Sequence, residues 1–365
     1  MGGPQEGGGG VQERVHGGRP PPGVEDFSNP LNPLGPPREL EAALKEASTE
    51  AAHRKYPDYS YKGLREALAS YYDIDAEAVV PLAGAAESLP LALAAFRPDA
   101  LVTVEPTFGD HRVQAAGAGV SWATAHYIQE GRRFLLDPGL VCSLVNRIRG
   151  RTLVVVSNPN NPTGSLAPAS VIWEIASCLD EGSVLLVDEA FIDFTSSPGV
   201  LRNPPPQTIV VRSLTKILAT PGLRVGFAYS ADKNLSRRLD MVRQPWNVGG
   251  LAALAIEKLI SRSSKEFRRH VESSRSLVTK LREAAVTALR AAGLEVFDSK
   301  APYLLVWHRL RHPSMQRCLE ARGYYVRDAS SFPYLTPNYS RVSVRRGVEG
   351  LASAFADALQ ARGRC

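Results

Sequence analysis

Cysteine is scarce in this sequence, and its spacing argues against several kinds of site. The chain has four cysteines in 365 residues, at Cys142, Cys178, Cys318 and Cys365. No two of them form a CxxC pair, which argues against a zinc site and against a disulfide framework. Cys178 and Cys318 fall within helical patterns, where a free cysteine packs like a small apolar side chain. We therefore expect neither a metal centre nor a disulfide framework.

Long apolar runs and compact runs of charge are also missing. No stretch of about 18 apolar residues exists, and the N-terminus lacks a signal-type hydrophobic segment, so we expect a soluble, cytoplasmic protein with no membrane span. The formal net charge is +6, but the basic residues are mostly arginines spread among Asp and Glu. This mixed pattern favours a solvated surface over nucleic-acid binding, and the anionic partner that we expect is a small phosphate.

The remaining composition and patterning predict an α/β fold. With 44% hydrophobic residues, the chain can bury a large core. Short apolar segments alternate with helix-length segments, which predicts a mostly parallel sheet with right-handed crossovers. The expected strands cover residues 79–82, 101–104, 153–156, 184–187, 208–211 and 224–229. A long amphipathic helix over residues 265–292 precedes further short strands, which predicts a smaller α+β domain.

The pattern also predicts the domain organisation. Residues 1–15 are Gly-rich with little apolar content, so we expect a disordered tail. Residues 16–50 are expected to form an N-terminal arm that packs with the small domain. The large domain is expected to cover residues 51–262 and the small domain residues 263–365.

The strongest chemical candidate is a lysine that follows a buried strand. Lys216 comes just past the expected carboxyl end of the strand at 208–211, where open α/β sheets place their ligands. A lysine is rarely buried without a partner, so we interpret Lys216 as a residue that forms a Schiff base with a carbonyl substrate or with pyridoxal phosphate. The alternative is an ordinary surface lysine. Ser213 and Arg224 flank it, so a hydroxyl and a guanidinium can hold one phosphate beside the lysine.

Other candidates follow neighbouring strands. Asp188 can pair with a protonated ring nitrogen, and Asn161 can donate to a phenolate oxygen from a turn whose Asn-Pro bonds are candidates for the cis form. Backbone N–H groups in the turn at 84–88 can hold a phosphate, and Phe108 can stack on a flat ring. The alternative for each of these features alone is an ordinary turn or core packing.

Taken together and in this order, the motifs carry a resemblance. The segments NNPTG at 160–164, DEAF at 188–191 and SLTK at 213–216, with Arg224 behind them, resemble the fold-type I pyridoxal-phosphate enzymes, the aspartate aminotransferase superfamily. Within it, the chain is similar to the histidinol-phosphate aminotransferase branch, and most of all to the threonine-phosphate decarboxylases of cobalamin synthesis. The resemblance runs from residue 16 to the C-terminus. It implies an aspartate-aminotransferase-like fold, pyridoxal 5′-phosphate (PLP) as cofactor, and a homodimer with shared active sites.

The resemblance also implies a role for each matching position. Lys216 would be the catalytic Schiff-base lysine, and Asp188 would be the catalytic partner of the ring nitrogen. Further cofactor contacts are implied for Ala85, Ala86, Phe108, Asn161, Ser213 and Arg224, and for Tyr56, which would reach the cofactor of the neighbouring subunit. Substrate contacts are implied for His16, Asn32, Arg327 and Arg341, with Arg341 on the carboxylate and Arg327 near the phosphate. Asn247 is implied to be an interface or structural position.

Two reactions are compatible with this cofactor site. The N-terminal HGG and DFSxxxNPLG patterns, the segment at 244–248, and Phe191 in place of the aminotransferases' usual tyrosine favour a decarboxylase. The expected reaction converts L-threonine O-3-phosphate into (R)-1-amino-2-propanol O-2-phosphate. The alternative is amino transfer from histidinol phosphate or a related amino acid to 2-oxoglutarate. A third alternative, the effector-binding domain of a regulator, would need an attached helix-turn-helix, and residues 1–15 are too short and too polar to supply one.

Overall fold

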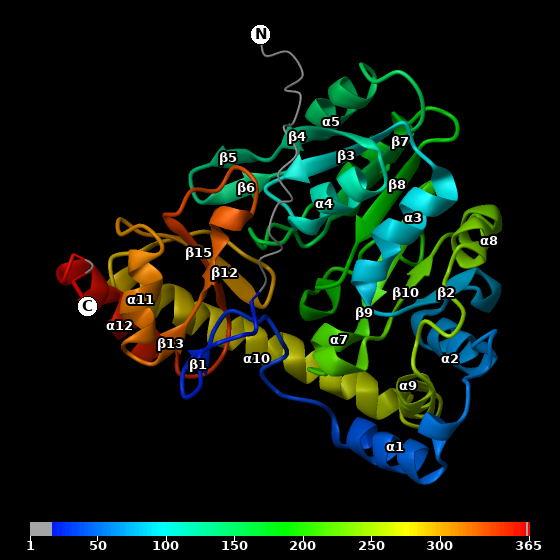
Figure 1. Ribbon diagram of the computed structural model, residues 1–365, viewed down its shortest axis with the longest axis horizontal. Coiled ribbons are helices and arrows are strands. Elements are labelled where there is room, and N and C mark those ends of the chain that lie inside the picture. Colours follow the sequence, from blue (N-terminus) through cyan, green and yellow to red (C-terminus); the bar gives the residue numbers. More distant parts are fainter. Residues whose placement is uncertain (1–16, 363) are drawn as a thin grey trace.

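A seven-stranded sheet forms the centre of the larger part of the molecule in the computed structural model, which describes residues 17–362, 364 and 365 (Figure 1). Its strand order is β2 (Val79–Leu82), β10 (Gly226–Tyr229), β9 (Thr208–Ser213), β8 (Val184–Asp188), β7 (Thr152–Ser157), β3 (Ala100–Glu105) and β4 (Ser121–His126). β10 runs antiparallel to both of its neighbours, and the other pairs are parallel. The predicted α/β class with a mostly parallel sheet is confirmed.

Helices cover both faces of this sheet, which explains the continuous apolar strands. Successive strand residues point to opposite faces: Leu153 and Val155 of β7 belong to one buried cluster, whereas Val154 and Val156 belong to the other. The helices of this part are α1 (Arg38–Thr49), α2 (Lys62–Tyr72), α3 (Ser88–Phe96), α4 (Asp110–Gly117), α5 (Pro138–Val145), α6 (Ala169–Ser177), α7 (Leu214–Ile217), α8 (Lys233–Met241) and α9 (Gly250–Arg262). The core therefore lies on both sides of the sheet, and the strand ends remain for the site.

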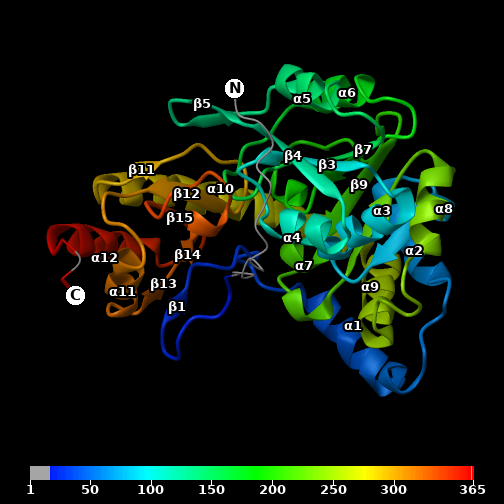
Figure 2. The ribbon, with the colours of Figure 1, turned by 45° about the horizontal axis from the view of Figure 1, so that its top comes forward.

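A smaller part of the molecule is built around a second sheet. The long helix α10 (Ser264–Ala291) leads into this part. Figure 2 shows the second sheet on the opposite side of the molecule from α3 and α8. The sheet is antiparallel and has the order β11 (Glu295–Val296), β12 (Tyr303–Trp307), β15 (Tyr339–Ser343) and β14 (Arg327–Asp328). The helices α11 (Ser314–Glu320) and α12 (Val348–Gln360) accompany it.

The N-terminal segment contacts both parts. β1 (Glu25–Asp26) pairs in parallel with β13 (Tyr324–Tyr325) of the smaller part, whereas α1 packs on α9 of the larger part. A short hairpin, β5 (Ile128–Glu130) and β6 (Arg133–Leu135), extends from the larger part. The expected tail at residues 1–15 lies outside the described residues, and the predicted domain limits stay predictions. In the described part of the chain, no helix combines the length and apolar character needed to cross a membrane.

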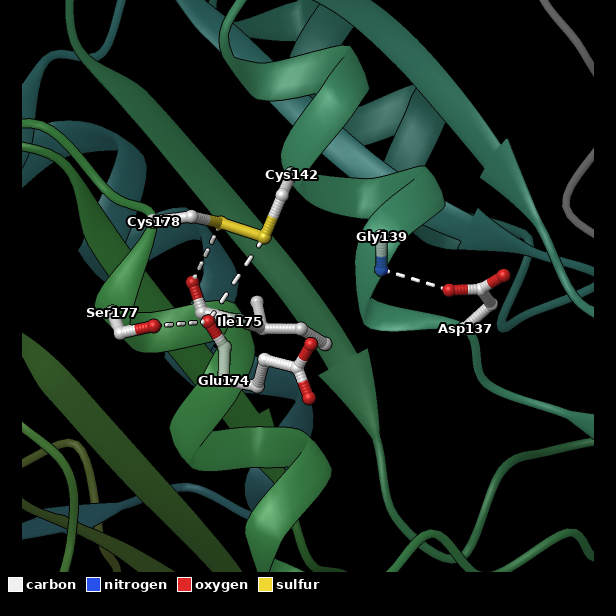
Figure 3. The surroundings of a disulfide bond; sticks show 7 residues. All are labelled: Asp137, Gly139, Cys142, Glu174, Ile175, Ser177 and Cys178. Carbon is white, nitrogen blue, oxygen red and sulfur yellow. Dashed lines mark hydrogen bonds between the residues drawn. A yellow bond between two sulfur atoms is a disulfide. The ribbon is translucent and has the colours of Figure 1, made fainter.

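The cysteines are paired, so the prediction that they form no disulfides was wrong. Figure 3 shows the bond between Cys142 of α5 and Cys178 at the end of α6, whose Cα atoms are 5.7 Å apart. The second bond joins Cys318 of α11 to Cys365, with Cα atoms 5.1 Å apart. The partners are 36 and 47 residues apart in sequence. Tertiary packing brings them together, and their spacing in the sequence contained no signal of it.

Candidate active site

A cavity of about 440 Å³ lies at the carboxyl ends of β7, β8 and β9, on the side that faces the smaller sheet. Ten of the residues singled out in the sequence line it: Ala85, Ala86, Phe108, Asn161, Asp188, Ser213, Lys216, Arg224, Arg327 and Arg341. Parallel strands place their carboxyl ends at one edge, so motifs that are far apart in the chain meet there. The cavity is the candidate active site.

Lys216 is held in the cavity by the short helix α7, which follows β9 directly. Burial, together with the positive charges of Arg341 and Arg224, lowers the pKa of its amine to about 8. The nearby carboxylate of Asp188 acts in the opposite direction but does not cancel these effects. The amine is therefore unprotonated in a substantial fraction of molecules near pH 8, which a nucleophilic lysine requires.

Asp188 is the last residue of β8 and lines the same cavity. Burial raises the pKa of its carboxyl group to about 6, although the N–H of Ala190 donates a hydrogen bond of 2.9 Å to its Oδ1. The group is still mostly ionised at neutral pH. It can therefore hold a protonated ring nitrogen.

One end of the cavity collects phosphate donors. Ser213 and Thr215 lie in hydroxyl contact at 2.8 Å. Ala85 and Ala86 stand in the first turn of a short 3₁₀ segment, where backbone N–H groups have no partner within the turn. Two hydroxyls and two N–H groups therefore converge near Arg224.

Arg224 reaches the phosphate donors because the residue opposite its guanidinium, Gly84, has no side chain. Its Nη2 donates to the carbonyl of Ala83 at 3.2 Å. A Cβ at Gly84 would lie 2.5 Å from that nitrogen, and Gly84 has a φ of +80°. Only a glycine combines this left-handed backbone with the close approach of the guanidinium.

Arg341 is buried and incompletely paired. Its Nη1 donates to Oδ1 of Asn161 at 2.6 Å and its Nη2 to the carbonyl of Ser28 at 2.8 Å. Its Nε is buried without a hydrogen-bond partner among the described residues. Burial lowers the pKa of the guanidinium to about 10. A buried guanidinium with an unused donor is suited to a carboxylate ligand.

Arg327 lies beside it on the neighbouring strand. Its Nη1 donates to the carbonyl of Asp328 at 2.7 Å, and its Nη2 donates to the hydroxyl of Ser331. The ring of Phe332 contacts the guanidiniums of both Arg327 and Arg341, at 5.2 and 5.8 Å from the ring centre. The cavity thus offers two positive groups in addition to Arg224.

These side chains fit PLP. The hydroxyls, N–H groups and Arg224 match the needs of its phosphate, Asp188 matches its ring nitrogen, and Lys216 matches its aldehyde. Phe108 lines the same cavity and offers a flat apolar face. The Asn158–Pro159 and Asn161–Pro162 peptide bonds are both cis, as the sequence analysis suggested for Asn-Pro bonds in this turn.

Two of the predicted residues are placed elsewhere, and a third lies outside the described residues. Asn32 is not among the residues that line the cavity. Its Nδ2 donates to the carbonyl of Ile217 at 2.6 Å and to the hydroxyl of Ser274 at 2.7 Å. It therefore links the end of α7, the helix that contains Lys216, to α10. The nearby Ser28, Asn29 and Pro30 line the cavity instead. Tyr56 lies on the surface, 79% exposed. His16 lies outside the described residues, and its role stays a prediction.

Tyr56 and Asn247 lie close together, because Tyr56 packs against Trp246, the residue before Asn247. Tyr56 stacks near Trp246, with ring centres 4.5 Å apart. The adjacent Asn247 donates to the carbonyl of Pro81 and to Glu87, at 3.0 and 2.7 Å. Asn247 therefore holds the segment between β2 and α3 in place, and Tyr56 is outside the cavity of its own chain.

Sequence reasoning missed several lining residues. Thr215 lies between Ser213 and Lys216 in the sequence. Two hydroxyl residues so close to the candidate lysine were a signal that both bind the phosphate. His111 and Gln114 of α4 also line the cavity, and His111 Nδ1 and Gln114 Oε1 are buried without partners among the described residues. Burial lowers the pKa of His111 to about 4, so its imidazole is neutral. Nothing in the helical pattern of α4 distinguished these two side chains from packing residues.

The charge of Lys216 predicts a pH-dependent stability for the cofactor-free protein. The folded-state pKa of about 8 lies below the ordinary 10.5, so between these values the unfolded chain binds more protons and stability rises with pH. We expect Lys216→Met to stabilise the cofactor-free protein by about 1–2 kcal/mol at pH 7. The gain should vanish as the pH rises through 8 to 10.5, measured by urea unfolding at several pH values. A gain that does not change with pH would contradict a buried, destabilised ammonium.

Comparisons with known proteins agree with this geometry. The model of the family described as aminotransferase class I and II matches residues 25–355. A threonine-phosphate decarboxylase of Salmonella typhimurium is 29% identical over 337 residues, covering 89% of this chain and 87% of that protein. A histidinol-phosphate aminotransferase of Mycobacterium tuberculosis is 31% identical over an alignment of 367 residues, covering 96% and 92%. The solved structure of a histidinol-phosphate aminotransferase from Sinorhizobium meliloti in complex with pyridoxal-5′-phosphate superposes with a TM-score of 0.77 and 20% identity, covering 92% of this chain and 90% of the other.

Proposed function

Because the chain belongs to the aminotransferase class I and II family and PLP is its cofactor, we propose that it decarboxylates L-threonine O-3-phosphate to (R)-1-amino-2-propanol O-2-phosphate. The observation that carries the proposal is the pair of guanidiniums, Arg327 and Arg341, that line the cavity together with Lys216. A phosphorylated amino acid has two anionic groups, and this pair can bind one each. Relatives named for this reaction support the assignment.

The chain's own residues position the substrate. Bound PLP supplies an electron sink that stabilises negative charge at the substrate's α-carbon. Arg341 is held by Asn161 and the carbonyl of Ser28, so its guanidinium has a fixed position in the lining of the cavity and still has unused donors. Arg327 is pinned in the same way by the Asp328 carbonyl. Two fixed anchors determine which bond of the α-carbon is placed for cleavage, and positioning of this kind decides the reaction.

Lys216 and Asp188 have different proton-transfer roles in the cavity. With a pKa of about 8, the amine of Lys216 can take up and release a proton near neutral pH. With a pKa of about 6, Asp188 keeps its negative charge at the same pH. Lys216 can therefore exchange a proton while Asp188 stays negatively charged.

Phe191 favours the decarboxylase over the aminotransferase. Its ring packs edge-on against Tyr303, with centres 5.0 Å apart, and it has no hydroxyl to donate to the cofactor. The hydroxyl of Tyr303 is itself engaged, because it donates to the carbonyl of Asn160 at 2.8 Å. The second candidate is an aminotransferase that acts on histidinol phosphate, and the name of the mycobacterial relative favours it.

Product analysis separates the two reactions. The PLP-loaded protein is incubated with L-threonine O-3-phosphate, and CO₂ and the amino-propanol phosphate are assayed. In parallel it is incubated with histidinol phosphate and 2-oxoglutarate, and glutamate is assayed. Decarboxylation without glutamate formation is expected. Glutamate formation without CO₂ release would replace the proposal with the aminotransferase.

We also propose that the working unit is a homodimer in which Tyr56 reaches the partner's cofactor. Tyr56 and Trp246 form an exposed aromatic pair, 79% and 42% exposed, and Met241, five residues before Trp246 in the sequence, is 84% exposed. An apolar surface of this kind is typical of an interface. Tyr56 cannot act in its own cavity, so a role at the cofactor requires a second subunit.

A charge at the exposed Met241 should weaken the dimer if this apolar surface is the interface. We expect the 39.5 kDa chain to sediment as a dimer, and Met241→Arg to raise the dimer dissociation constant at least about tenfold. Tyr56→Phe should leave the dimer intact and weaken PLP binding. Trp173→Arg, at a partly exposed position on α6, serves as the control and should change neither value. A wild-type protein that sediments as a monomer at all concentrations would rule out the shared site.

A further inference from the structure

A second cavity, of about 270 Å³, lies away from the candidate active site. The end of α2, the loop after β8 and the first half of α10 line it. Arg212 of β9 lines this cavity, whereas the next residue, Ser213, lines the first one. Successive residues of a strand point to opposite faces, so the two cavities lie on opposite sides of β9.

The lining of this cavity is rich in arginine. Four guanidiniums line it, together with the carboxylates of Asp193 and Glu272. Arg212 is already paired with two carboxylates, because its Nε donates to Glu189 at 2.8 Å and its Nη1 to Asp193 at 2.9 Å. The other three arginines then face one remaining carboxylate, that of Glu272. The cavity has an excess of positive charge for an anion to neutralise.

These three arginines are held in place but have unused donors. Arg202 donates its Nε to the carbonyl of Tyr72 at 3.1 Å, and Arg268 donates its Nη2 to the carbonyl of Tyr71 at 3.0 Å. Arg275 donates its Nε to the carbonyl of Asp193 at 2.8 Å. Within the part of the chain that the structure describes, each makes this one hydrogen bond. A guanidinium has five N–H donors, and Arg202 and Arg268 are exposed whereas Arg275 is half-buried, so most of these donors are open to solvent and to a ligand.

A buried phenol completes the lining. Tyr72 is 7% exposed, and its hydroxyl has no hydrogen-bond partner among the described residues. Burial raises the pKa of Tyr72 well above its ordinary value, so the hydroxyl is protonated and can donate. A buried polar group without a partner is unfavourable. Tyr72 lines the cavity, and a ligand oxygen that reached its hydroxyl would satisfy it.

We propose that this cavity binds a small dianion whose phosphate or carboxylate oxygens accept hydrogen bonds from Arg202, Arg268 and Tyr72. The volume admits an inorganic phosphate with space for a short organic body. Leu201 and Val271 provide apolar contacts for that body. Guanidiniums bind both kinds of oxygen in a forked geometry, which accounts for their number here.

The cavity is connected to the candidate active site through one buried ion-pair group. Arg212 precedes Ser213 in β9, and Glu189 follows Asp188, the last residue of β8, so both members of this ion pair are next in sequence to residues that line the first cavity. Asp193 belongs to the same ion-pair group and lines the second cavity. A bound anion would therefore contact the group that supports β8 and β9 at their carboxyl ends.

Calorimetry on the PLP-loaded protein tests the proposal, with inorganic phosphate and succinate as probes. The variant Arg327→Gln identifies any phosphate binding in the first cavity. We expect a separate binding event that Arg327→Gln leaves unchanged and that Arg202→Gln/Arg268→Gln weakens at least about tenfold. Tyr72→Phe removes only the hydroxyl oxygen, keeps every charge, and should weaken the same event about fivefold.

The control is Arg269→Gln, on the same helix. Arg269 pairs with Glu266 at 2.7 Å on the exposed side and does not line the cavity, so its loss should leave the event unchanged. Tighter binding of phosphate than of succinate would assign a phosphate ester, and the reverse order a dicarboxylate. Absence of any event besides the one lost in Arg327→Gln would overturn the proposal. Equal affinities in the wild type and Tyr72→Phe would also overturn it, and that variant decides the matter if the double variant does not fold.

Discussion

Replacing Lys216 with alanine is expected to abolish covalent retention of PLP and to lower turnover by about 10³-fold or more. Lys216 is the only lysine among the described residues that line the cavity. Its lowered pKa makes its amine the reactive one at neutral pH. The remaining phosphate donors do not depend on the lysine, so we expect the variant still to bind PLP, without a covalent bond.

Borohydride reduction followed by mass spectrometry of peptides measures this result. In the wild type, the peptide that contains Lys216 should gain the mass of the reduced cofactor, and the variant should gain none. Lys280→Ala, at an exposed position on α10, is the matched control and should label like the wild type. A label that persists on Lys216→Ala would remove the basis of the proposed chemistry.

The largest loss of stability is expected from Arg212→Met. The side chain is almost the same size, but the buried carboxylates of Glu189 and Asp193 lose their counter-charge at 2.8 and 2.9 Å. The carbonyl of Pro198 also loses its donor, at 3.1 Å. Breaking one side of a buried ion-pair group costs about 3–5 kcal/mol. Urea unfolding at pH 7.5 should show this loss, and Arg269→Met at an exposed pair should cost about 0–1 kcal/mol.

The same variant should recover part of its stability in acid. Burial already raises the pKa of Glu189 while Arg212 opposes the shift, and without the arginine the folded-state pKa rises further above the unfolded value. The folded variant then binds more protons than the unfolded chain, so the penalty is present above the folded-state pKa and shrinks as the pH falls. A deficit of the same size at pH 5 and pH 8 would show that lost packing, rather than unpaired charge, causes it.

The sequence predicted the strands wherever burial on both faces made the apolar run continuous, as in β2, β7 and β9. It missed β4, because that strand lies at the sheet edge and Ser121 and Trp122 are exposed. The antiparallel direction of β10 was also not predictable, since a buried strand has the same apolar pattern in either direction. Direction depends on the connection and on the neighbouring strands, which are tertiary features.

The site was predictable to the extent that strand ends position it. Lys216, Asp188 and Asn161 meet because each lies at or just beyond the carboxyl end of a parallel strand. Asn32 does not line the cavity with them, because a motif gives the position of a residue in the chain but not the direction of its side chain. His111 was missed for the same reason: a helical pattern does not show which face borders a cavity.

The bond between Cys142 and Cys178 has a practical consequence for limited proteolysis. It closes a loop that contains β7 and Asn161. A single cut inside that loop would leave both fragments joined, and the nicked protein would migrate as one band on a gel without reductant and as two bands with it. Asn161 could in this way remain in place in a chain that is no longer continuous.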